Sequence, residues 1–269
     1  MNQEPEEPKI YLLPNLMTAG NLLCGFLAIL TIFQGMQAVD LLAAKPYYRN
    51  ALFYIFGACI FDLLDGRLAR LGGQESPFGR EFDSLADIVS FGIAPAMLVS
   101  RAVLFDLTLP GKFQHAESGF TWAIAFIYLL CGAVRLARFN CLAAQPNADT
   151  NFRGIPIPMA AGFIASLTFL IIDFHEQERT IGSWSYLLAA MMIGVSLLMV
   201  SDIRYPSFKK IDLKTRANRS TFIVGALVLA ILIKYHDYAP VAIFVSYLSY
   251  GIVRPLFAKK RAKKVSETH

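Results

Sequence analysis

Residues 61–95 read FDLLDGRLARLGGQESPFGREFDSLADIVSFGIAP, and this stretch decides both the fold and the chemistry expected of the chain. It joins two apolar runs through a loop that contains glycine and proline. Asp62 and Asp65 precede the loop, and Asp83 and Asp87 follow it. Charged side chains are costly inside membrane segments, so a group of aspartates there indicates a functional site.

The spacing of these aspartates predicts that they meet. Asp62 and Asp65 are three residues apart, and Asp83 and Asp87 are four apart, so each pair lies on one face of a helix. Because the glycines allow the chain to reverse, two antiparallel helices would bring the carboxylates together near the membrane surface. Several anions in so small a volume require cations. Oxygen ligands suit hard divalent ions, and we therefore expect Mg²⁺ or Mn²⁺.

Other residues of the stretch suit a pyrophosphate substrate. Gly66 and Gly79 lie close to the aspartates in sequence, and a residue without a side chain lets a ligand approach the backbone. Arg70 carries a planar guanidinium group that can bind phosphate. A single aspartate pair can be a capping or loop feature, and Asp87 alone can be a charge favoured at a helix N-terminus. The complete set favours a metal-assisted site.

Long apolar segments surround this stretch on both sides. The chain is 55% hydrophobic and 17% charged, with a mean hydropathy of +0.48. A membrane helix needs roughly 20 apolar residues. We predict an all-α, polytopic membrane bundle of about eight helices, of which the last two are short and can form a tight hairpin. The expected spans are 12–34, 47–68, 84–106, 120–142, 155–173, 183–203, 219–235 and 238–254.

The distribution of lysine and arginine predicts the orientation. Eight spans place both termini on one side, and that side carries 19 of these residues against 6 on the other. Basic loops stay in the cytoplasm, so we expect cytoplasmic termini, with the aspartates facing the cytoplasm from the cell (inner) membrane. The expected segments are a cytoplasmic one (1–11), a catalytic membrane domain (12–254) and a basic cytoplasmic tail (255–269). The net charge of +5 suits anionic membrane lipids, and we expect no nucleic-acid partner.

The complete pattern resembles the signature of the CDP-alcohol phosphotransferase family, also called CDP-alcohol phosphatidyltransferases. It reads Asp62-x2-Asp65-Gly66-x2-Ala69-Arg70-x8-Gly79-x3-Asp83-x3-Asp87. The resemblance implies six core membrane helices, a homodimer and a polar cavity open to the cytoplasm, so that two of the eight expected spans are additional. We expect Asp62, Asp65 and Asp83 to hold one or two divalent cations, with Asp87 completing a second site.

The resemblance also implies a donor substrate, CDP-diacylglycerol. Asn15 and Thr18, in the segment PNLMT (14–18), would lie near the nucleotide. Ser76 would contact the CDP moiety, although an ordinary loop serine is an equal alternative. The residues expected to bind the donor are Asn15, Thr18, Gly66, Ala69, Arg70, Ser76 and Gly79.

Further segments resemble the branch of the family whose acceptor is L-serine. They are LPNLMTAGNLLCGF (13–26), RLARFN (135–140), FRGIPIP (152–158) and MVSDIRYPSFK (199–209). Arg135 and Arg138 can bind the serine carboxylate, or they can anchor a helix end at the cytoplasmic surface. Asn140 can add a hydrogen bond to the same ligand. Arg153 can meet the phosphate or the amino acid.

We therefore expect an enzyme that transfers a phosphatidyl group from CDP-diacylglycerol to L-serine, with Asp87 as the general base. Another acceptor, such as glycerol 3-phosphate, inositol 1-phosphate or phosphatidylglycerol, is the nearest alternative, because the same arginines would suit a phosphorylated alcohol. A cation transporter that uses the aspartates is the alternative from another class. Transporters usually contain repeated halves, and this sequence shows no internal repeat.

Overall fold

The computed structural model describes residues 11–39, 41–73, 76–104, 119–143, 154–174, 183–203 and 241–251. These residues form helices and no strands, which confirms the predicted all-α class. The elements are α1 (Leu12–Met36), α2 (Leu41–Leu71), α3 (Pro77–Asp87), the π-helical η1 (Ile88–Ile93), α4 (Ala94–Ala102), α5 (Gly119–Ala143), α6 (Ile157–Phe174) and α7 (Ser183–Val200). A further apolar helix covers Val241–Gly251.

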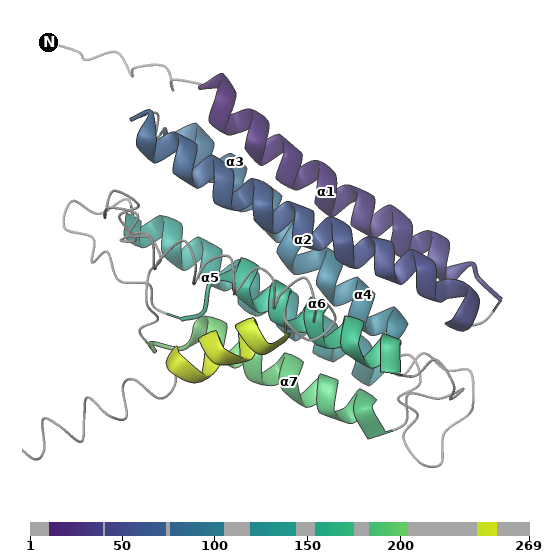
Figure 1. Cartoon of the computed structure of the whole chain (residues 1–269). Helices are drawn as coiled ribbons and strands as arrows, with labels where there is room; N and C mark the ends of the chain where they lie inside the picture. The colour runs from purple at the N-terminus through teal and green to yellow at the C-terminus, as the bar shows by residue number, and fades with distance from the viewer. Residues whose placement is uncertain are drawn as a thin grey trace, which may run out of the picture.

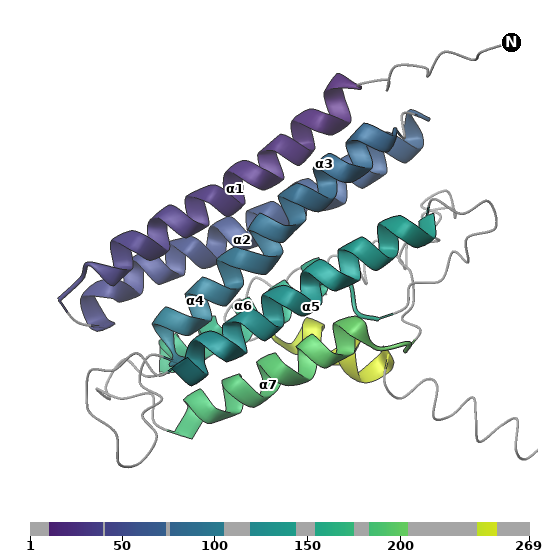
Figure 2. The same cartoon turned by 180° about the vertical axis from the view of Figure 1, so that it is seen from behind.

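The helices run up and down along a common direction (Figures 1 and 2). α1 packs along α2, and the continuous rod of α3, η1 and α4 lies between this pair and the layer of α5, α6 and α7. The starts of α1 and α3 and the ends of α2 and α5 lie at one end of the bundle, which we call the site end. At the opposite end, the Lys45 ammonium lies 3.3 Å from the Asp173 carboxylate and joins the start of α2 to the end of α6.

α1 packs against its neighbours through small and polar residues and turns its large apolar residues outward. Its buried residues recur at spacings of three and four and are mostly small or polar. A Cβ at Gly20 would lie 2.8 Å from the Phe61 ring of α2, and one at Gly35 would lie 2.8 Å from Tyr48. Small residues at a helix interface with large apolar ones outside are typical of packing in lipid. The outward side chains are Leu12, Leu13, Leu16, Leu23, Phe26, Leu30 and Phe33.

The structure confirms the predicted membrane character in part. Three helical segments, Leu12–Met36, Pro77–Ala102 and Thr121–Leu142, are long and apolar enough to cross a membrane. The apolar helices Ile157–Asp173, Trp184–Val200 and Val241–Gly251 are shorter. The expected span 219–235 and the tail 255–269 lie outside the described residues. The total of eight spans and the orientation of the termini stay predictions.

The third predicted span begins earlier in the chain than we expected. The sequence suggested that Asp83 and Asp87 begin this helix, whereas α3 starts at Pro77. Ser76 is its N-cap, and the Gly79 amide donates to Ser76 Oγ at 3.0 Å. A serine cap followed by proline at the first helical position is a strong start signal. Asp83 and Asp87 therefore lie inside the helix, beyond its first turn.

Candidate active site

Three of the four predicted aspartates meet between α2 and α3. One carboxylate oxygen from each of Asp62, Asp83 and Asp87 lies within 4.8 Å of the other two. Asp87 is only 5% exposed, and Asp83 Oδ1 is buried without a hydrogen-bond partner among the described residues. None of the three forms an ion pair with a lysine or arginine in the described part of the chain. We call these three residues the carboxylate cluster.

The donor set of the carboxylate cluster fits a divalent cation. Buried carboxylates repel one another unless a positive charge lies among them. The cluster offers only oxygen atoms, and the unpartnered Asp83 Oδ1 is free to act as a ligand. Such a set suits Mg²⁺ or Mn²⁺ better than a soft metal. The geometry thus agrees with the expected kind of cofactor, while the choice of ion stays a prediction.

The fourth aspartate, Asp65, is turned towards α1. Thr18 Oγ1 donates to Asp65 Oδ2 at 2.9 Å, so Thr18, which was expected near the nucleotide, bonds to a predicted metal ligand. A Cβ at Gly66 would lie only 3.3 Å from Arg70 Nη1. The absence of a side chain at Gly66 therefore lets the Arg70 guanidinium lie against the helix. There, Arg70 is within electrostatic reach of Asp62 and Asp65.

Most of the remaining residues expected to bind the donor substrate lie near the first turn of α3. A Cβ at Gly79 would lie 3.2 Å from Ser76 Oγ and 3.4 Å from Asn15 Oδ1, so these three residues are neighbours. Ser76 is already engaged as a helix cap. Asn15 Nδ2 is buried and has no hydrogen-bond partner among the described atoms. Ala69 is half-buried on the last part of α2. The structure thus brings this group together, while its contact with CDP stays a prediction.

Sequence reasoning missed one residue that touches the carboxylate cluster. Asn21 of α1 is fully buried, and its Nδ2 donates to Asp87 Oδ1 at 3.1 Å. Its backbone oxygen accepts a hydrogen bond of 2.9 Å from Ser90 Oγ in η1. A signal was present in the sequence, because Asn15, Thr18 and Asn21 recur every third residue in the otherwise apolar first half of the helix.

The π-helical segment η1 follows Asp87 directly. The Ala94 amide bonds to the Val89 oxygen, which is the five-residue spacing of a π-helix. The Tyr128 hydroxyl of α5 donates to the Phe91 oxygen at 2.9 Å and so satisfies a carbonyl within this segment. π-Helical turns occur frequently at functional sites. The additional residue in this turn rotates α4 relative to α3 about the helix axis. The aspartates of α3 and the buried apolar residues of α4 can therefore face different neighbours.

Among the residues expected to bind the acceptor substrate, Arg135 of α5 lies beside the carboxylate cluster. Its side chain is buried, with 8% exposure, and lies within electrostatic reach of Asp62 and Asp87. Its Nε has no hydrogen-bond partner in the described structure. A buried guanidinium with an unused donor is suited to an anionic ligand.

The other residues expected to bind the acceptor substrate are Arg138, Asn140 and Arg153, and they have different surroundings. Arg138 donates to the Asp202 carboxylate and to the Val200 oxygen, and so ties α5 to the end of α7. Asn140 Nδ2 donates to Ser84 Oγ at 3.0 Å and to Glu81 Oε2 at 3.2 Å, both on α3. These contacts position helix ends. Arg153 lies outside the described residues.

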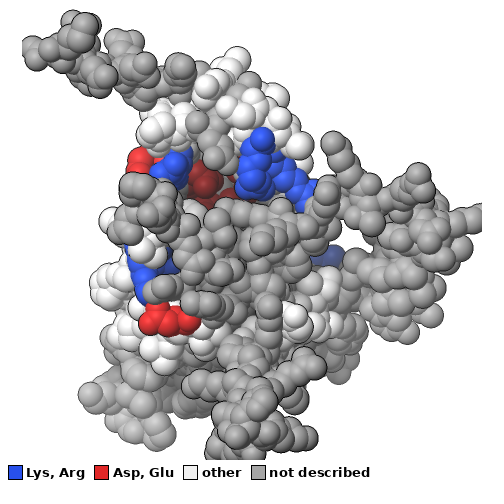
Figure 3. Space-filling view, turned by 90° about the vertical axis from the view of Figure 1, so that its left-hand side faces the viewer, with Lys and Arg blue, Asp and Glu red and all other residues white. Residues whose placement is uncertain are grey.

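The surface at the site end is recessed around some of its acidic side chains. Figure 3 looks onto this end and shows acidic side chains recessed between groups of basic ones. An anionic substrate would be attracted by the basic rim and would reach the acidic centre only with cations present. This polarity suits a phosphate compound that arrives with a divalent ion.

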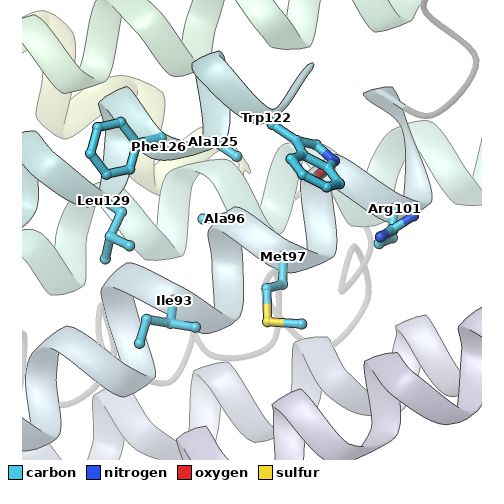
Figure 4. Close-up of a pocket in the computed structure, with 9 residues that line it drawn as sticks. Ile93, Ala96, Met97, Arg101, Trp122, Ala125, Phe126 and Leu129 are labelled. Atoms are coloured by element: carbon cyan, nitrogen blue, oxygen red, sulfur yellow. The ribbon is translucent and has the colours of Figure 1, made fainter. Parts of the chain in front are cut away.

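A separate groove lies between α4 and α5 (Figure 4). It has a volume of about 340 Å³ and no carboxylate in its lining. The lining residues are Ile93, Ala96, Met97, Ser100, Arg101, Trp122, Ala125, Phe126 and Leu129. Because this groove is largely apolar and lacks acidic ligands, it is distinct from the carboxylate cluster.

Comparison with known proteins extends the resemblance to most of the chain. The sequence model of the CDP-alcohol phosphatidyltransferase family matches residues 11–200. A CDP-diacylglycerol–serine O-phosphatidyltransferase of Helicobacter pylori is 34% identical over 249 residues, which cover 92% of each chain. Proteins of the same name from Methanocaldococcus jannaschii and Bacillus subtilis are 32% and 33% identical, over 85% and 74% of this chain and 92% of each relative.

Proposed function

The chain belongs to the CDP-alcohol phosphatidyltransferase family, and we propose that it transfers the phosphatidyl group of CDP-diacylglycerol to the hydroxyl of L-serine, with release of CMP. The observation that carries this proposal is the carboxylate cluster at the family signature, in a chain whose relatives along nearly its whole length are named for that reaction. The products are phosphatidylserine and CMP.

We assign the metal-binding role to Asp62, Asp83 and Asp87, with Asp65 beside them. A divalent cation bound there would draw charge from the pyrophosphate oxygens and so favour attack at phosphorus. Thr18 and Asn21 fix the side chains of Asp65 and Asp87 through the hydrogen bonds described above. Fixed ligands are pre-organised and need little rearrangement when the ion binds.

The donor substrate is placed by residues at the site end. The Arg70 guanidinium has the charge and the planar shape to bind a phosphate oxygen. The unpartnered amide Nδ2 of Asn15 can donate to the nucleotide, close to the bare backbone of Gly79. The acyl chains would stay in the bilayer beside the outward apolar face of the helices, so that only the headgroup enters the site end.

The acceptor is activated by Asp87 and oriented by Arg135. Asp87 accepts the proton of the serine hydroxyl as the hydroxyl oxygen attacks the lipid-side phosphorus. A bond forms between that oxygen and phosphorus, and the bond from phosphorus to the CMP oxygen breaks. Arg135 has an unused buried donor that can bind the serine carboxylate. The roles expected for Arg138, Asn140 and Arg153 at this acceptor site remain proposals from the resemblance.

We also propose that the protein is a homodimer in the cell (inner) membrane, with both termini and the active site on the cytoplasmic side. The family resemblance supports the dimer, and the excess of lysine and arginine on the side of the site end supports the orientation. Light scattering of the detergent-purified protein would measure the protein mass. A mass of one chain, 29.9 kDa, would contradict the dimer.

An activity assay tests the reaction directly. Purified protein receives CDP-diacylglycerol, Mn²⁺ or Mg²⁺ and labelled L-serine, and both labelled lipid and CMP are measured. We expect labelled phosphatidylserine that disappears when a chelator is added. CMP release only with glycerol 3-phosphate or inositol 1-phosphate would keep the chemistry and replace the acceptor. Folded protein that releases no CMP with any of these alcohols would contradict the proposed function.

A further inference from the structure

Asn21 is held from two directions beside the reacting groups. Its side-chain Nδ2 donates to Asp87 Oδ1 at 3.1 Å, and its backbone oxygen accepts from Ser90 Oγ at 2.9 Å. The side chain is 0% exposed. Asn21 therefore cannot turn away from Asp87 without breaking a buried hydrogen bond.

The other half of the Asn21 amide has no partner within the described part of the chain. Asn21 Oδ1 is buried and accepts no hydrogen bond from any residue that the structure describes. Because the amide is planar and its oxygen and nitrogen share one carbon, this oxygen lies close to the Asp87 contact. Asp83 Oδ1, another unpartnered buried oxygen of the described structure, is already proposed as a ligand of the divalent cation. Asn21 Oδ1 is a neutral amide oxygen, and a buried oxygen of this kind requires a hydrogen-bond donor.

The chemistry of the acceptor supplies such a donor. In the proposed reaction the single hydroxyl proton of serine goes to Asp87, and the serine carboxylate goes to Arg135. The ammonium group is on the carbon next to the one that bears the hydroxyl, so it lies beside the reacting oxygen. A cationic N–H forms a stronger hydrogen bond to a buried oxygen than a neutral hydroxyl does.

We infer, on the basis of the proposed function, that Asn21 selects an amino alcohol as the acceptor. Its amide N–H holds the Asp87 carboxylate in place, and its amide oxygen accepts a hydrogen bond from the substrate ammonium. An acceptor alcohol without an ammonium group leaves that buried oxygen unpaired. Asn21 is therefore a positioning residue towards Asp87 and a specificity residue towards the substrate.

Two unreactive analogues of the acceptor test the ammonium contact. L-Alanine and propanoate both lack the hydroxyl and both carry the carboxylate, but only alanine has the ammonium group. Their inhibition constants are measured against serine, with the wild type and Asn21→Ala in the same detergent. We expect alanine to inhibit the wild type more strongly than propanoate, and the ratio to shrink about tenfold in Asn21→Ala, as for loss of a charge-assisted hydrogen bond.

A matched control lies further along the same buried face. Thr31 of α1 is buried, and its hydroxyl donates to the Leu27 oxygen of its own helix at 2.6 Å. Thr31→Val should keep the wild-type ratio of inhibition constants. Asn21→Asp separates the two halves of the amide, because it keeps an oxygen and removes the N–H. We expect this variant to keep the preference for alanine and to lose kcat.

Several outcomes would overturn the inference. An unchanged ratio in Asn21→Ala would mean that the oxygen does not meet the ammonium, even if turnover falls. A higher Mn²⁺ requirement with an unchanged ratio would mean that the oxygen faces the metal. If Asn21→Ala does not fold, Asn21→Ser replaces it, because serine is polar but lacks the amide oxygen. The ratio of inhibition constants should shrink in the same way. A wild type that makes no labelled lipid from serine would instead contradict the proposed function itself.

Discussion

Asp87 has the surroundings that we propose for both a general base and a metal ligand. It is 5% exposed, lies within the carboxylate cluster and is fixed by Asn21. A carboxylate held rigidly and shielded from water is well placed to accept a proton from a bound alcohol. Since the serine hydroxyl is a poor nucleophile at neutral pH, the reaction depends on such a group.

Replacement of Asp87 by asparagine should therefore remove turnover and spare much of the lipid binding. The side chain keeps its size and loses its ability to take a proton, so we expect CMP release to fall by at least about 100-fold. Binding of labelled CDP-diacylglycerol should stay within a few-fold of the wild type. Asp173→Asn is the matched control, because Asp173 pairs with Lys45 at the opposite end of the bundle. Near-wild-type turnover in Asp87→Asn would rule out the assignment of the base.

The residues of the cluster could be predicted because their spacing in the sequence determines which helix face they occupy. Aspartates three or four residues apart share a helix face, and a glycine-containing loop between two apolar helices brings the two faces together. Hydrogen-bond partners are less accessible to such reasoning. The recurrence of Asn15, Thr18 and Asn21 indicates a polar face on α1, but it does not specify which of them bonds to Asp87 of α3. The pairing of Arg138 with Asp202 likewise joins helices that are far apart in the sequence.

At the level of elements, the close approach of α1 to η1 places Asn21 against Asp87. Gly25 makes this approach possible, because a Cβ there would lie 2.3 Å from Ser90 Oγ and 2.7 Å from the Ser90 Cα. The second contact is with the backbone, so a rotamer change alone cannot relieve it. The helices would have to separate.

Gly25→Ala should therefore reduce both stability and activity. We expect a loss of about 1–3 kcal/mol, typical of overpacking, and a lower kcat because the hydrogen bond from Asn21 to Asp87 is stretched. Thermal unfolding in detergent and CMP release would measure the two effects. Gly57→Ala is the control, since its Cβ would meet Cys24 Sγ at an ordinary 3.5 Å. Equal behaviour of the two variants would show that the α1–η1 contact does not position the site.

Tyr128 supports the same π-helical segment from the side of α5. Its hydroxyl is the donor to the Phe91 oxygen, and the residue is fully buried. Tyr128→Phe would leave that carbonyl without its partner, so we expect a destabilisation of about 1–2 kcal/mol and a lower kcat. Tyr186→Phe on the exposed face of α7 is the control, because this side chain is 52% exposed. A Tyr128→Phe enzyme with wild-type melting temperature and kcat would contradict a supporting role.

The elements themselves could be predicted only in part from the sequence. Apolar length predicted helices in the ranges that became α1, α2, α5, α6 and α7. It did not predict η1, because an additional residue in one turn leaves the apolar pattern of 84–106 unbroken. The extension of α2 to Leu71 also went beyond the apolar run, and the Thr18 hydroxyl of α1 bonds to Asp65 in this charged part of the helix.

For the whole molecule, the charges on α2 raise the question of whether this helix crosses the membrane. α2 has 31 residues, which at 1.5 Å per residue extend about 46 Å, more than the roughly 30 Å of a hydrocarbon core. Its aspartates lie near the site end and face other helices, so the apolar part can still span the core. The segment between α1 and α2 and the last turn of α2 should then lie on opposite sides.

Cysteine labelling at these two places tests the orientation. In a variant that lacks Cys24, Cys59, Cys131 and Cys141, a single cysteine replaces either Val39, which is 99% exposed, or Leu71, which is 86% exposed. We expect a membrane-impermeant maleimide to label Val39→Cys in right-side-out vesicles, and Leu71→Cys only after the vesicles are opened. The reverse pattern would place the active site outside the cytoplasm. Labelling of both positions from one side would mean that α2 does not cross the membrane, and the orientation proposed for the carboxylate cluster would then be wrong.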